Sequence, residues 1–159
     1  MKIIAARHCQ TDWNAQNRVQ GIIDTELNEE GWRQAEELAE KVGGERVDRV
    51  VSSTLMRAVQ TAWIVAHRIR APLTVDDRLR ECSFGSLDGL HFTEFGLRCG
   101  PTNMSIWHDV LASDFTSFGG DKGTDVFVRQ KALLDELKAA HEAETVMVIG
   151  HGRSLRTLL

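Results

Sequence analysis

The sequence predicts an α/β fold, a sandwich of helices around a mostly parallel central sheet. Three short apolar runs, rich in β-branched residues, are typical of strands buried on both faces; they span residues 3–6, 47–51 and 146–149. Amphipathic helical patterns lie between these runs, and such alternation favours a parallel sheet covered by helices. With 159 residues, of which 42% are hydrophobic and 26% charged, the chain is expected to form one globular domain over residues 1–159.

The first half of the chain alternates strands and helices. After the strand at 3–6, Asn28 is suited to cap a helix that Gly43 and Gly44 end. The second strand, 47–51, leads into a helix that starts near Thr54 and stops before Pro72. Each helix carries one apolar stripe, formed in the first by Trp32, Ala35, Leu38, Ala39 and Val42, and in the second by Leu55, Ala58, Ala62, Val65, Ala66 and Ile69.

The second half contains a long irregular stretch before the last helix and strand. A fourth short strand is expected at 73–75, and the poorly periodic residues 85–118 are expected to form loops and short helices. Thr124 is suited to cap a long helix that precedes the strand at 146–149. The apolar residues of that helix are Val126, Leu133, Leu134, Leu137 and Ala140.

Charge and cysteine content limit the partners and the compartment. There are 19 Lys and Arg against 23 Asp and Glu, and the net charge of −4 argues against nucleic acid or an acidic membrane as partner. Cys9, Cys82 and Cys99 are odd in number and widely spaced, which fits a reducing compartment better than a disulfide framework. The apolar run at 1–6 is too short for a signal peptide, and no run approaches the roughly 20 residues of a membrane helix. We therefore expect a cytoplasmic protein.

Chemically capable side chains follow three of the predicted strands. Arg7-His8 follows the first strand, Ser52-Ser53 and then Arg57 follow the second, and Gly150-His151-Gly152 follows the last. Ligands of open α/β sheets bind beyond the carboxyl ends of the strands, so two histidines and two arginines are expected to converge there. Each residue alone is more often structural or a surface charge, and periodicity alone leaves the two interpretations about even.

A phosphoryl group suits such a cluster. Arginine forks match phosphate oxygens, and cationic neighbours keep a nearby histidine neutral, with a nitrogen free for attack. A phosphohistidine divides the reaction into two easier steps, and a general acid must then protonate the leaving alcohol. Glu81 is the candidate acid, although a loop carboxylate is commonly only solvated.

Other site chemistries fail on spacing. A cysteine phosphatase needs an arginine six positions after its cysteine, but those positions hold Ala15, Asp88 and Ser105. Neither a G-x-x-x-x-G-K-[ST] phosphate loop nor a G-x-S-x-G nucleophile elbow occurs. The six histidines include no pair at metal-ligand spacing, so no metal site is expected.

Four blocks follow one known pattern in order. Residues 7–14, RHCQTDWN, match R-H-G-x-T-x-x-N except at Cys9, and residues 18–21 continue that block. Residues 52–62 form the second block, residues 79–85 the acid block, and residues 150–152 the second histidine block. Each block alone is weak, but four in order over almost the whole chain are highly specific. Together they resemble the histidine phosphatase superfamily, the phosphoglycerate-mutase-like proteins.

The resemblance implies a three-layer α/β/α sandwich, no metal and no cofactor. It also implies a role for each matching residue. His8 would be the phosphorylated nucleophile, Glu81 the proton donor, and His151 the third catalytic residue, which also binds phosphoryl oxygens. The implied phosphate-binding residues are Arg7, Arg57, Asn14, Thr11 and Gly152, and the residues bordering the substrate are Gln20 and Gly21.

Chain length and one motif favour the phosphatase branch of this family. Mutases tend to be longer and usually lack the Arg-x-Gln-Gly that residues 18–21 form here. We therefore expect a metal-independent phosphomonoesterase that acts through a phosphohistidine on His8, with a small-molecule phosphate ester as its partner. A phosphoglycerate-mutase-type phosphotransferase is the alternative. Sugar phosphates, an α-ribazole phosphate and a broad range of monoesters stay open as substrates.

Residues 91–121 form an insert that is expected to cover the pocket like a lid. Five aromatic residues either line an apolar wall of the pocket or, as is more common, only pack the insert onto the sheet. They are Phe92, Phe95, Trp107, Phe115 and Phe118.

Three features depart from the family pattern. Cys9 replaces a glycine, and we expect its thiol to pack as a small apolar group; the alternative is a reactive thiol whose pKa the arginines lower. Gly120-Asp121-Lys122 replaces the usual Gly-Glu-Ser. The sequence ends eight residues after His151, where most members continue through a further helix and strand, so the end of the family fold is expected to be missing.

These departures have two consequences. An edge strand left unpaired favours association, so a homodimer is one expected assembly. They also keep open a second class of function, a catalytically impaired module that binds phospho-ligands. The joint presence of His8, Glu81 and His151 argues against it, because a binding module needs no proton donor.

Overall fold

Four parallel strands form the central sheet in the computed structural model, which describes residues 1–158. Their order across the sheet is β1 (Lys2–Arg7), β4 (Thr145–Gly150), β2 (Arg49–Ser52) and β3 (Leu73–Val75). Arg7 pairs with Gly150 and Ser52 pairs with Ile149, so the carboxyl ends of β1, β4 and β2 are level. The parallel α/β fold expected from the sequence is confirmed.

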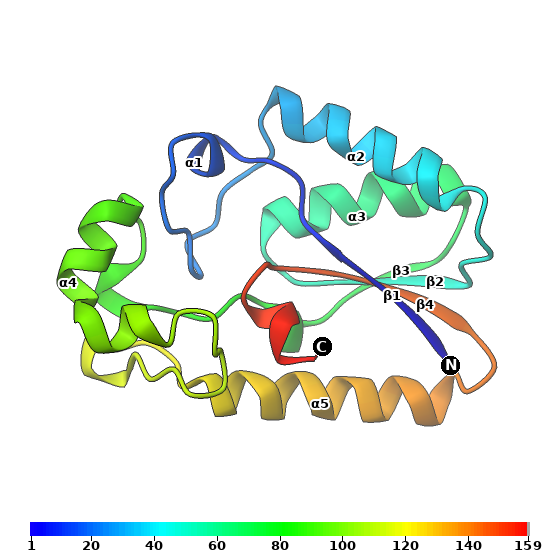
Figure 1. Cartoon of the computed structure of the whole chain (residues 1–159). Coiled ribbons are helices and arrows are strands. Elements are labelled where there is room, and N and C mark those ends of the chain that lie inside the picture. The colour runs from blue at the N-terminus through cyan, green and yellow to red at the C-terminus, as the bar shows by residue number, and fades with distance from the viewer. Residues whose placement is uncertain (159) are drawn as a thin grey trace.

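Helices cover both faces of the sheet (Figure 1). α2 (Glu29–Val42) and α3 (Met56–Ile69) lie on one face and α5 (Gly123–Ala140) lies on the other, which gives the expected three layers. As predicted, Asn28 caps α2, because its side chain accepts a hydrogen bond from the Gly31 N–H at 2.9 Å. Two further helices, α1 (Asp12–Ala15) and α4 (Phe92–Ser105), lie beyond the carboxyl ends of the strands.

The prediction that β1 is buried on both faces is wrong. Ile3 is 41% exposed, and Lys2, Ala5 and Arg7 are exposed as well. β1 lies at the edge of the sheet, whereas the central strand β4 is buried along all but its first residue. A short apolar run therefore predicts a strand but does not distinguish an edge strand from a central one.

Other predicted bounds differ from the structure in small ways. β2 starts at Arg49, two residues later than predicted. Trp32 is exposed, and Gly31 takes its expected place on the buried face of α2. α5 starts at Gly123 with Lys122 as its N-cap residue, so Thr124 lies inside the helix and does not cap it. The four-residue helix α1 has no apolar periodicity and was missed.

The region between β3 and α5 has a small core of its own. It contains short helical pieces, as predicted: α4 is interrupted at Gly100, and the 3-10 turns span Gly85–Leu87 and Thr116–Phe118. Its buried side chains, together with Val19 from the loop after α1 and Val126 of α5, form an apolar group that we call the insert cluster. The members from the region itself are Cys82, Phe84, Leu87, Phe95, Cys99 and Phe115. The insert cluster is separate from the two cores that the sheet shares with its helices.

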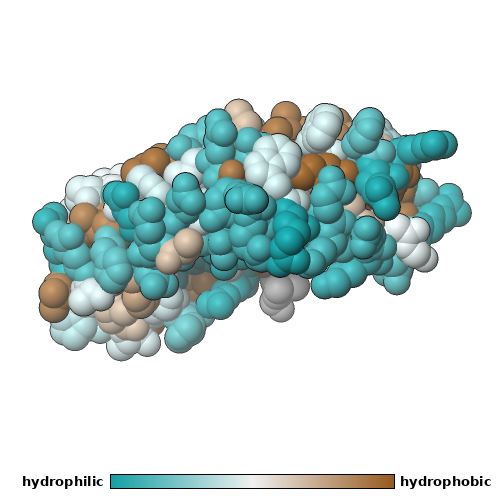
Figure 2. All heavy atoms as spheres, turned by 90° about the horizontal axis from the view of Figure 1, so that it is seen from above, coloured by the Kyte–Doolittle hydropathy of each residue, from teal (hydrophilic) through white to brown (hydrophobic). Residues whose placement is uncertain are grey.

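Seen from the side of α2 and α3, the surface is mainly hydrophilic, with scattered hydrophobic residues (Figure 2). Among residues 1–158, no helix combines the length and the apolar character needed to cross a bilayer.

Candidate active site

Three neighbouring strand ends bring the predicted histidines together. His8 directly follows β1, and its N–H donates to the carbonyl oxygen of Gly150 in β4 at 2.9 Å. Ser53 directly follows β2, and its N–H donates to the carbonyl oxygen of Ile149 at 2.9 Å. The hydrogen bonds of the sheet thus fix His8, Ser53 and His151 as neighbours. The centroids of the His8 and His151 rings are 5.1 Å apart.

His8 is a buried, neutral imidazole with one nitrogen free. Its Nδ1 lies 2.7 Å from the carbonyl oxygen of Cys9. A carbonyl oxygen only accepts, so Nδ1 carries the proton and Nε2 keeps its lone pair. Burial first, and the charge of Arg57 second, lower the pKa of His8 from 6.5 to about 3. The cationic neighbours expected from the sequence do help to keep His8 neutral, but burial is the larger cause.

His151 presents the opposite nitrogen as a donor. Its Nε2 lies 2.7 Å from the Ser53 hydroxyl, which accepts a hydrogen bond from the Leu55 N–H. The Ser53 hydroxyl has no other acceptor among the described residues, so we assign it as the donor to Nε2, which places the His151 proton on Nδ1. Nδ1 is buried and has no acceptor among the described residues. Burial, followed by Arg57, lowers the pKa of His151 well below 6.5.

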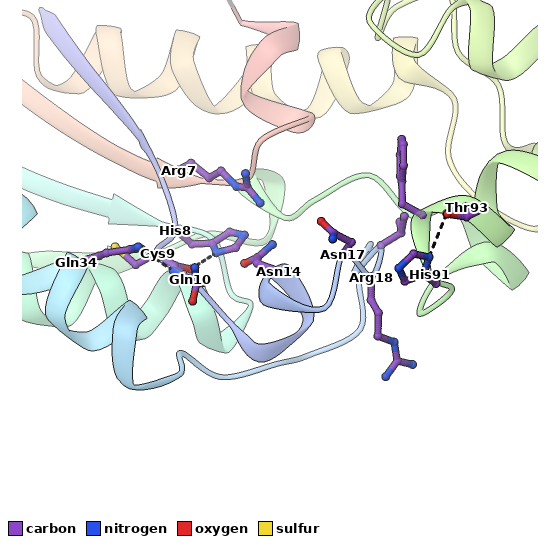
Figure 3. A pocket seen from close by; sticks show the side chains of 12 residues that line it. Arg7, His8, Cys9, Gln10, Asn14, Asn17, Arg18, Gln34, His91 and Thr93 are labelled. Carbon is purple, nitrogen blue, oxygen red and sulfur yellow. Dashed lines mark hydrogen bonds between the residues drawn. The ribbon is translucent and has the colours of Figure 1, made fainter.

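The two predicted phosphate-binding arginines are held differently. Arg57 is fully buried and donates from Nη1 to the Ile23 carbonyl and from Nη2 to the Gly21 carbonyl, each at 2.8 Å. Its Nε has no acceptor in residues 1–158. Burial lowers the pKa of Arg57 to about 10, which still leaves it charged at neutral pH. Arg7 is exposed and points into the cavity beside His8 (Figure 3). Gly152 packs against Arg7: a Cβ added at Gly152 would lie 3.4 Å from both Cδ and Nε of Arg7.

Thr11 positions Asn14 and Gln20. It is the N-cap residue of α1, and its hydroxyl lies 3.1 Å from Oδ1 of Asn14 and 3.0 Å from Oε1 of Gln20. The Thr11 N–H also donates to Oδ1 of Asn14, which turns the amide nitrogen of Asn14 away from Thr11. Asn14 lies beside His8 (Figure 3). Thr11 itself is fully buried beneath these side chains and is placed to orient them.

Gly21 allows the loop to approach Asp88. Its φ is +50°, and a Cβ there would overlap the Asp88 carboxylate at 1.7 Å. The Gly21 carbonyl accepts from Arg57, so this close approach also fixes the arginine. Burial raises the pKa of Asp88 to about 6.

Glu81 is fixed by three backbone N–H groups. Its Oε1 accepts from Cys82 at 2.9 Å and from Ser154 at 2.7 Å, and its Oε2 accepts from Arg153 at 3.1 Å. Two of these donors lie directly after the second histidine block, so Glu81 is tied to the β4 end of the site. Oε2 accepts only one of the three bonds and is the carboxylate oxygen with fewer partners.

His8 lies at the junction of two cavities. The wider one, of about 650 Å³, extends from Gln34 and Cys9 past His8 to His91 (Figure 3). The smaller one, of about 210 Å³, also contains Gly152 and the side chains of the predicted nucleophile, acid and arginines. Its lining includes Arg7, His8, Asn14, Gln20, Gly21, Arg57, Glu81 and Gly152. The smaller cavity is therefore the candidate catalytic cavity.

The far wall of the catalytic cavity was predicted only in part: Trp107 was among the aromatic residues expected either to line the pocket or to pack, whereas Arg153 was not named. It contains Phe84, Trp107 and Arg153, and Arg153 lies with its guanidinium carbon 4.4 Å from the Trp107 ring centroid. Arg153 directly follows the Gly150-His151-Gly152 block, so its position alone was a usable signal. Trp107 lies in a stretch without periodicity, so the sequence left lining and packing open for it, and the structure places it in the lining.

The aromatic residues of the insert divide between packing and lining. Phe95 and Phe115 are fully buried in the insert cluster, and Phe118 packs against that cluster. Trp107 lines the catalytic cavity, and Phe92 lines the wider one. Both interpretations from the sequence thus hold, each for different residues.

Cys9 is a packed thiol. Its side chain is buried in the core below α2 and α3, and its N–H donates to the Thr61 hydroxyl at 3.1 Å. Burial raises its pKa, which opposes the reactive-thiol alternative.

Comparison with known proteins shows the family of the chain. The family model of the histidine phosphatase superfamily (branch 1) matches residues 3–159. The chain belongs to this superfamily. A metal-independent phosphoserine phosphatase from Arabidopsis thaliana is 35% identical, over 99% of this chain and 66% of its own length. Phosphoserine phosphatase 1 from Hydrogenobacter thermophilus is 31% identical, over 99% of this chain and 74% of its own length.

A solved structure gives the same result. Mycobacterial glucosyl-3-phosphoglycerate phosphatase in complex with VO3 has a TM-score of 0.88 at 33% identity, covering 97% of this chain and 76% of that one. The chain thus spans 66% to 76% of the length of these three proteins. Within the described part of the chain, no three His, Cys, Asp or Glu side chains converge as a metal ion would require.

Proposed function

We propose that the chain hydrolyses a small phosphate monoester, without a metal ion, through a phosphohistidine on His8. The observation that carries this proposal is the neutral His8, with Nε2 unprotonated, in one cavity with Arg7, Arg57 and Glu81. The two curated relatives described above are phosphoserine phosphatases, and one of them is named as metal-independent.

In the first step, Arg7 and Arg57 neutralise the charge of the phosphoryl group, and neutral N–H donors such as His151 bind its oxygens. Arg7, Nε of Arg57, Nδ1–H of His151, the Asn14 amide and the Gly152 N–H would hold its oxygens. Nε2 of His8 attacks phosphorus, so that the N–P bond forms as the P–O ester bond breaks. Glu81 gives its proton to the leaving oxygen. Gln20 and Gly21 border the ester.

In the second step, water replaces the alcohol. Glu81, now ionised, takes a proton from the water as its oxygen attacks phosphorus. The N–P bond breaks, inorganic phosphate leaves, and both His8 and Glu81 return to their starting states. Residues 91–121 would cover the cavity during this sequence, because Trp107 of this insert already forms part of the wall.

The partner is then a small-molecule phosphate ester, which suits a cavity of about 210 Å³. The three cysteines are all free and buried, as suits a reducing compartment, and we place the reaction in the cytoplasm.

A panel of phosphate monoesters tests the proposal. The wild-type protein, dialysed against a chelator, should release inorganic phosphate from p-nitrophenyl phosphate and from at least one natural ester. His8→Ala should lose at least about a thousandfold in turnover, since the nucleophile is removed. Folding of the variant is checked by circular dichroism. A folded His8→Ala protein with full activity, or wild-type protein inactive on the whole panel, would contradict the proposal.

A further inference from the structure

The positive charge in the catalytic cavity exceeds what a phosphoryl group needs. Five arginines line it, Arg7, Arg18, Arg57, Arg153 and Arg156, while Glu81 is its one carboxylate. Of the nine other arginines, eight have a carboxylate oxygen within 4.0 Å. None of the five in the cavity has one among the described residues. Arginines without a carboxylate partner are therefore concentrated at this cavity, where an anionic ligand would supply the missing partner.

Outside the phosphoryl end, Arg153 is the arginine of the cavity with the most buried nitrogens that lack a hydrogen-bond acceptor in the described residues. Only 7% of it is exposed, and Nη1 donates to the carbonyl oxygen of Trp107 at 2.5 Å. Nε and Nη2 are buried and find no acceptor within residues 1–158. Burial lowers the pKa of Arg153, and the neighbouring Cys82 thiol and Glu81 carboxylate oppose that shift. Burial also raises the pKa of the Cys82 thiol to about 12, so the thiol is neutral and brings no negative charge.

The unpaired edge of Arg153 has the geometry of a carboxylate receptor. Nε–H and one N–H of Nη2 lie parallel on one edge of a guanidinium, at the spacing of two carboxylate oxygens. Arg153 stacks on Trp107, which fixes the plane of this edge. The guanidinium carbon also lies 5.8 Å from the ring centroid of Phe84 and 5.5 Å from that of Phe115. Buried donors without acceptors are costly, so such an arrangement favours a ligand that supplies them.

The position of Arg153 shows which part of a substrate it would meet. Its own N–H donates to Oε2 of Glu81, the proposed proton donor to the leaving alcohol. Arg153 therefore lies on the leaving-group side of the cavity. Arg156, one turn further along the 3-10 helix Ser154–Thr157, lines the same side and lies 3.4 Å from Nδ1 of His108. By contrast, Arg18 donates to the Gly89 carbonyl and stacks on Trp13, which ties it to the loop.

We propose that Arg153, supported by Arg156, is a specificity-determining residue that binds a carboxylate on the leaving alcohol of the substrate. The inference rests on the proposed function and names its substrate class: phosphate esters of hydroxy acids or hydroxy amino acids. Esters of the same size without the carboxylate leave the Arg153 fork unpaired and bind less tightly.

Binding to an inactive protein tests the inference apart from turnover. On the His8→Ala background, isothermal titration calorimetry compares O-phosphoserine with O-phosphoethanolamine, which differ only by the carboxylate. We expect O-phosphoserine to bind at least about tenfold more tightly. Adding Arg153→Met should reduce that ratio to within about threefold. Arg70→Asn is the matched control, because Arg70 is also unpaired but lies at the end of α3, away from the cavity, and asparagine tolerates its φ of +57°.

Two results would overturn the proposal. Equal binding of the two ligands by the parent overturns the proposal without any further variant. A preference that persists in folded Arg153→Met also overturns it. If thermal melts show that Arg153→Met does not fold, Arg153→Lys is used instead, since lysine keeps the charge but lacks the guanidinium fork. The preference of Arg153→Lys for O-phosphoserine should then be at least about fivefold smaller than that of the parent. Selective binding together with inactive wild-type protein would contradict the proposed function but not the carboxylate site.

Discussion

The phosphoryl end and the leaving-group end of the catalytic cavity are built in different ways. The phosphoryl end is built around the carboxyl ends of β1, β2 and β4, where ladder hydrogen bonds of 2.9 Å fix His8 and Ser53, and α1 and α3 add Asn14 and Arg57. The leaving-group end consists of Trp107 from the insert and Arg153 from the turn after β4, joined by one hydrogen bond. Its support is the insert cluster, which is separate from the cores of the sheet.

Under the proposed function, this difference separates the residues of the chemical step from those that select the substrate. Residues that must hold an attacking nitrogen within a fraction of an ångström belong on rigid strand ends. Residues that select one alcohol from another belong on a segment with its own packing, which can change without disturbing the sheet. Glu81 connects the two ends, because it lies after β3 and accepts hydrogen bonds from the backbone that follows His151.

Glu81→Gln should have the largest effect that depends on the leaving group. A glutamine cannot donate a proton at this position, so an alkyl phosphate should lose about 10²–10⁴-fold in kcat, and p-nitrophenyl phosphate much less. Steady-state kinetics on both esters measures the difference. Equal losses on the two substrates would remove Glu81 from the acid role and break the connection between the two ends.

Phe95→Ala tests whether the insert cluster contributes its own share of the stability, apart from the cores of the sheet. Phe95 is fully buried in the insert cluster, and its truncation should cost about 3–5 kcal/mol of unfolding free energy. Phe92 on the same helix is 40% exposed, so Phe92→Ala is a matched control with a much smaller cost. Urea denaturation measures both. Similar losses for the two variants would show that the insert has no core of its own.

The buried histidines should make the phosphoryl end sensitive to acid. The folded pKa of His8, about 3, lies below the value of 6.5 for an unfolded chain, so the unfolded state binds more protons between these pH values. Unfolding free energy should therefore fall as the pH drops, by about 1 kcal/mol for His8 between pH 7 and 5.5. His8→Gln should flatten this slope by that amount in urea titrations. An unchanged slope would mean that His8 is not held neutral by burial.

Cys9→Gly should have the smallest effect on catalysis. Cys9 has no positive φ and its thiol is packed below α2 and α3, so glycine is not required beside the nucleophile. Turnover of Cys9→Gly should stay within a few-fold of the wild type, and thiol reagents should inactivate the wild type slowly. A rise of about a hundredfold, near 2.7 kcal/mol of barrier, would instead mark the natural protein as an impaired catalyst.

The phosphoryl end was largely predictable from the sequence, whereas the leaving-group end was predictable only in part, since Arg153 was not named and the role of Trp107 stayed open. Apolar strands followed by Arg7-His8 and Gly150-His151 carry a local signal, and a parallel sheet brings such ends together. The wall at Trp107 depends on how residues 91–121 pack, which no period of the sequence encodes. The exposed β1 shows a related limit: an apolar run reveals a strand, whereas its place at the edge follows from the order of all four strands.

Trapping the phosphoenzyme tests the central claim most directly. The wild-type protein is mixed with a ³²P-labelled ester that it hydrolyses, quenched within milliseconds in alkali, and digested for peptide mapping. We predict an alkali-stable, acid-labile label on the peptide that contains His8, and no label on folded His8→Ala. A protein that turns over the ester with no such label, or that carries it on another residue, would contradict the phosphohistidine mechanism.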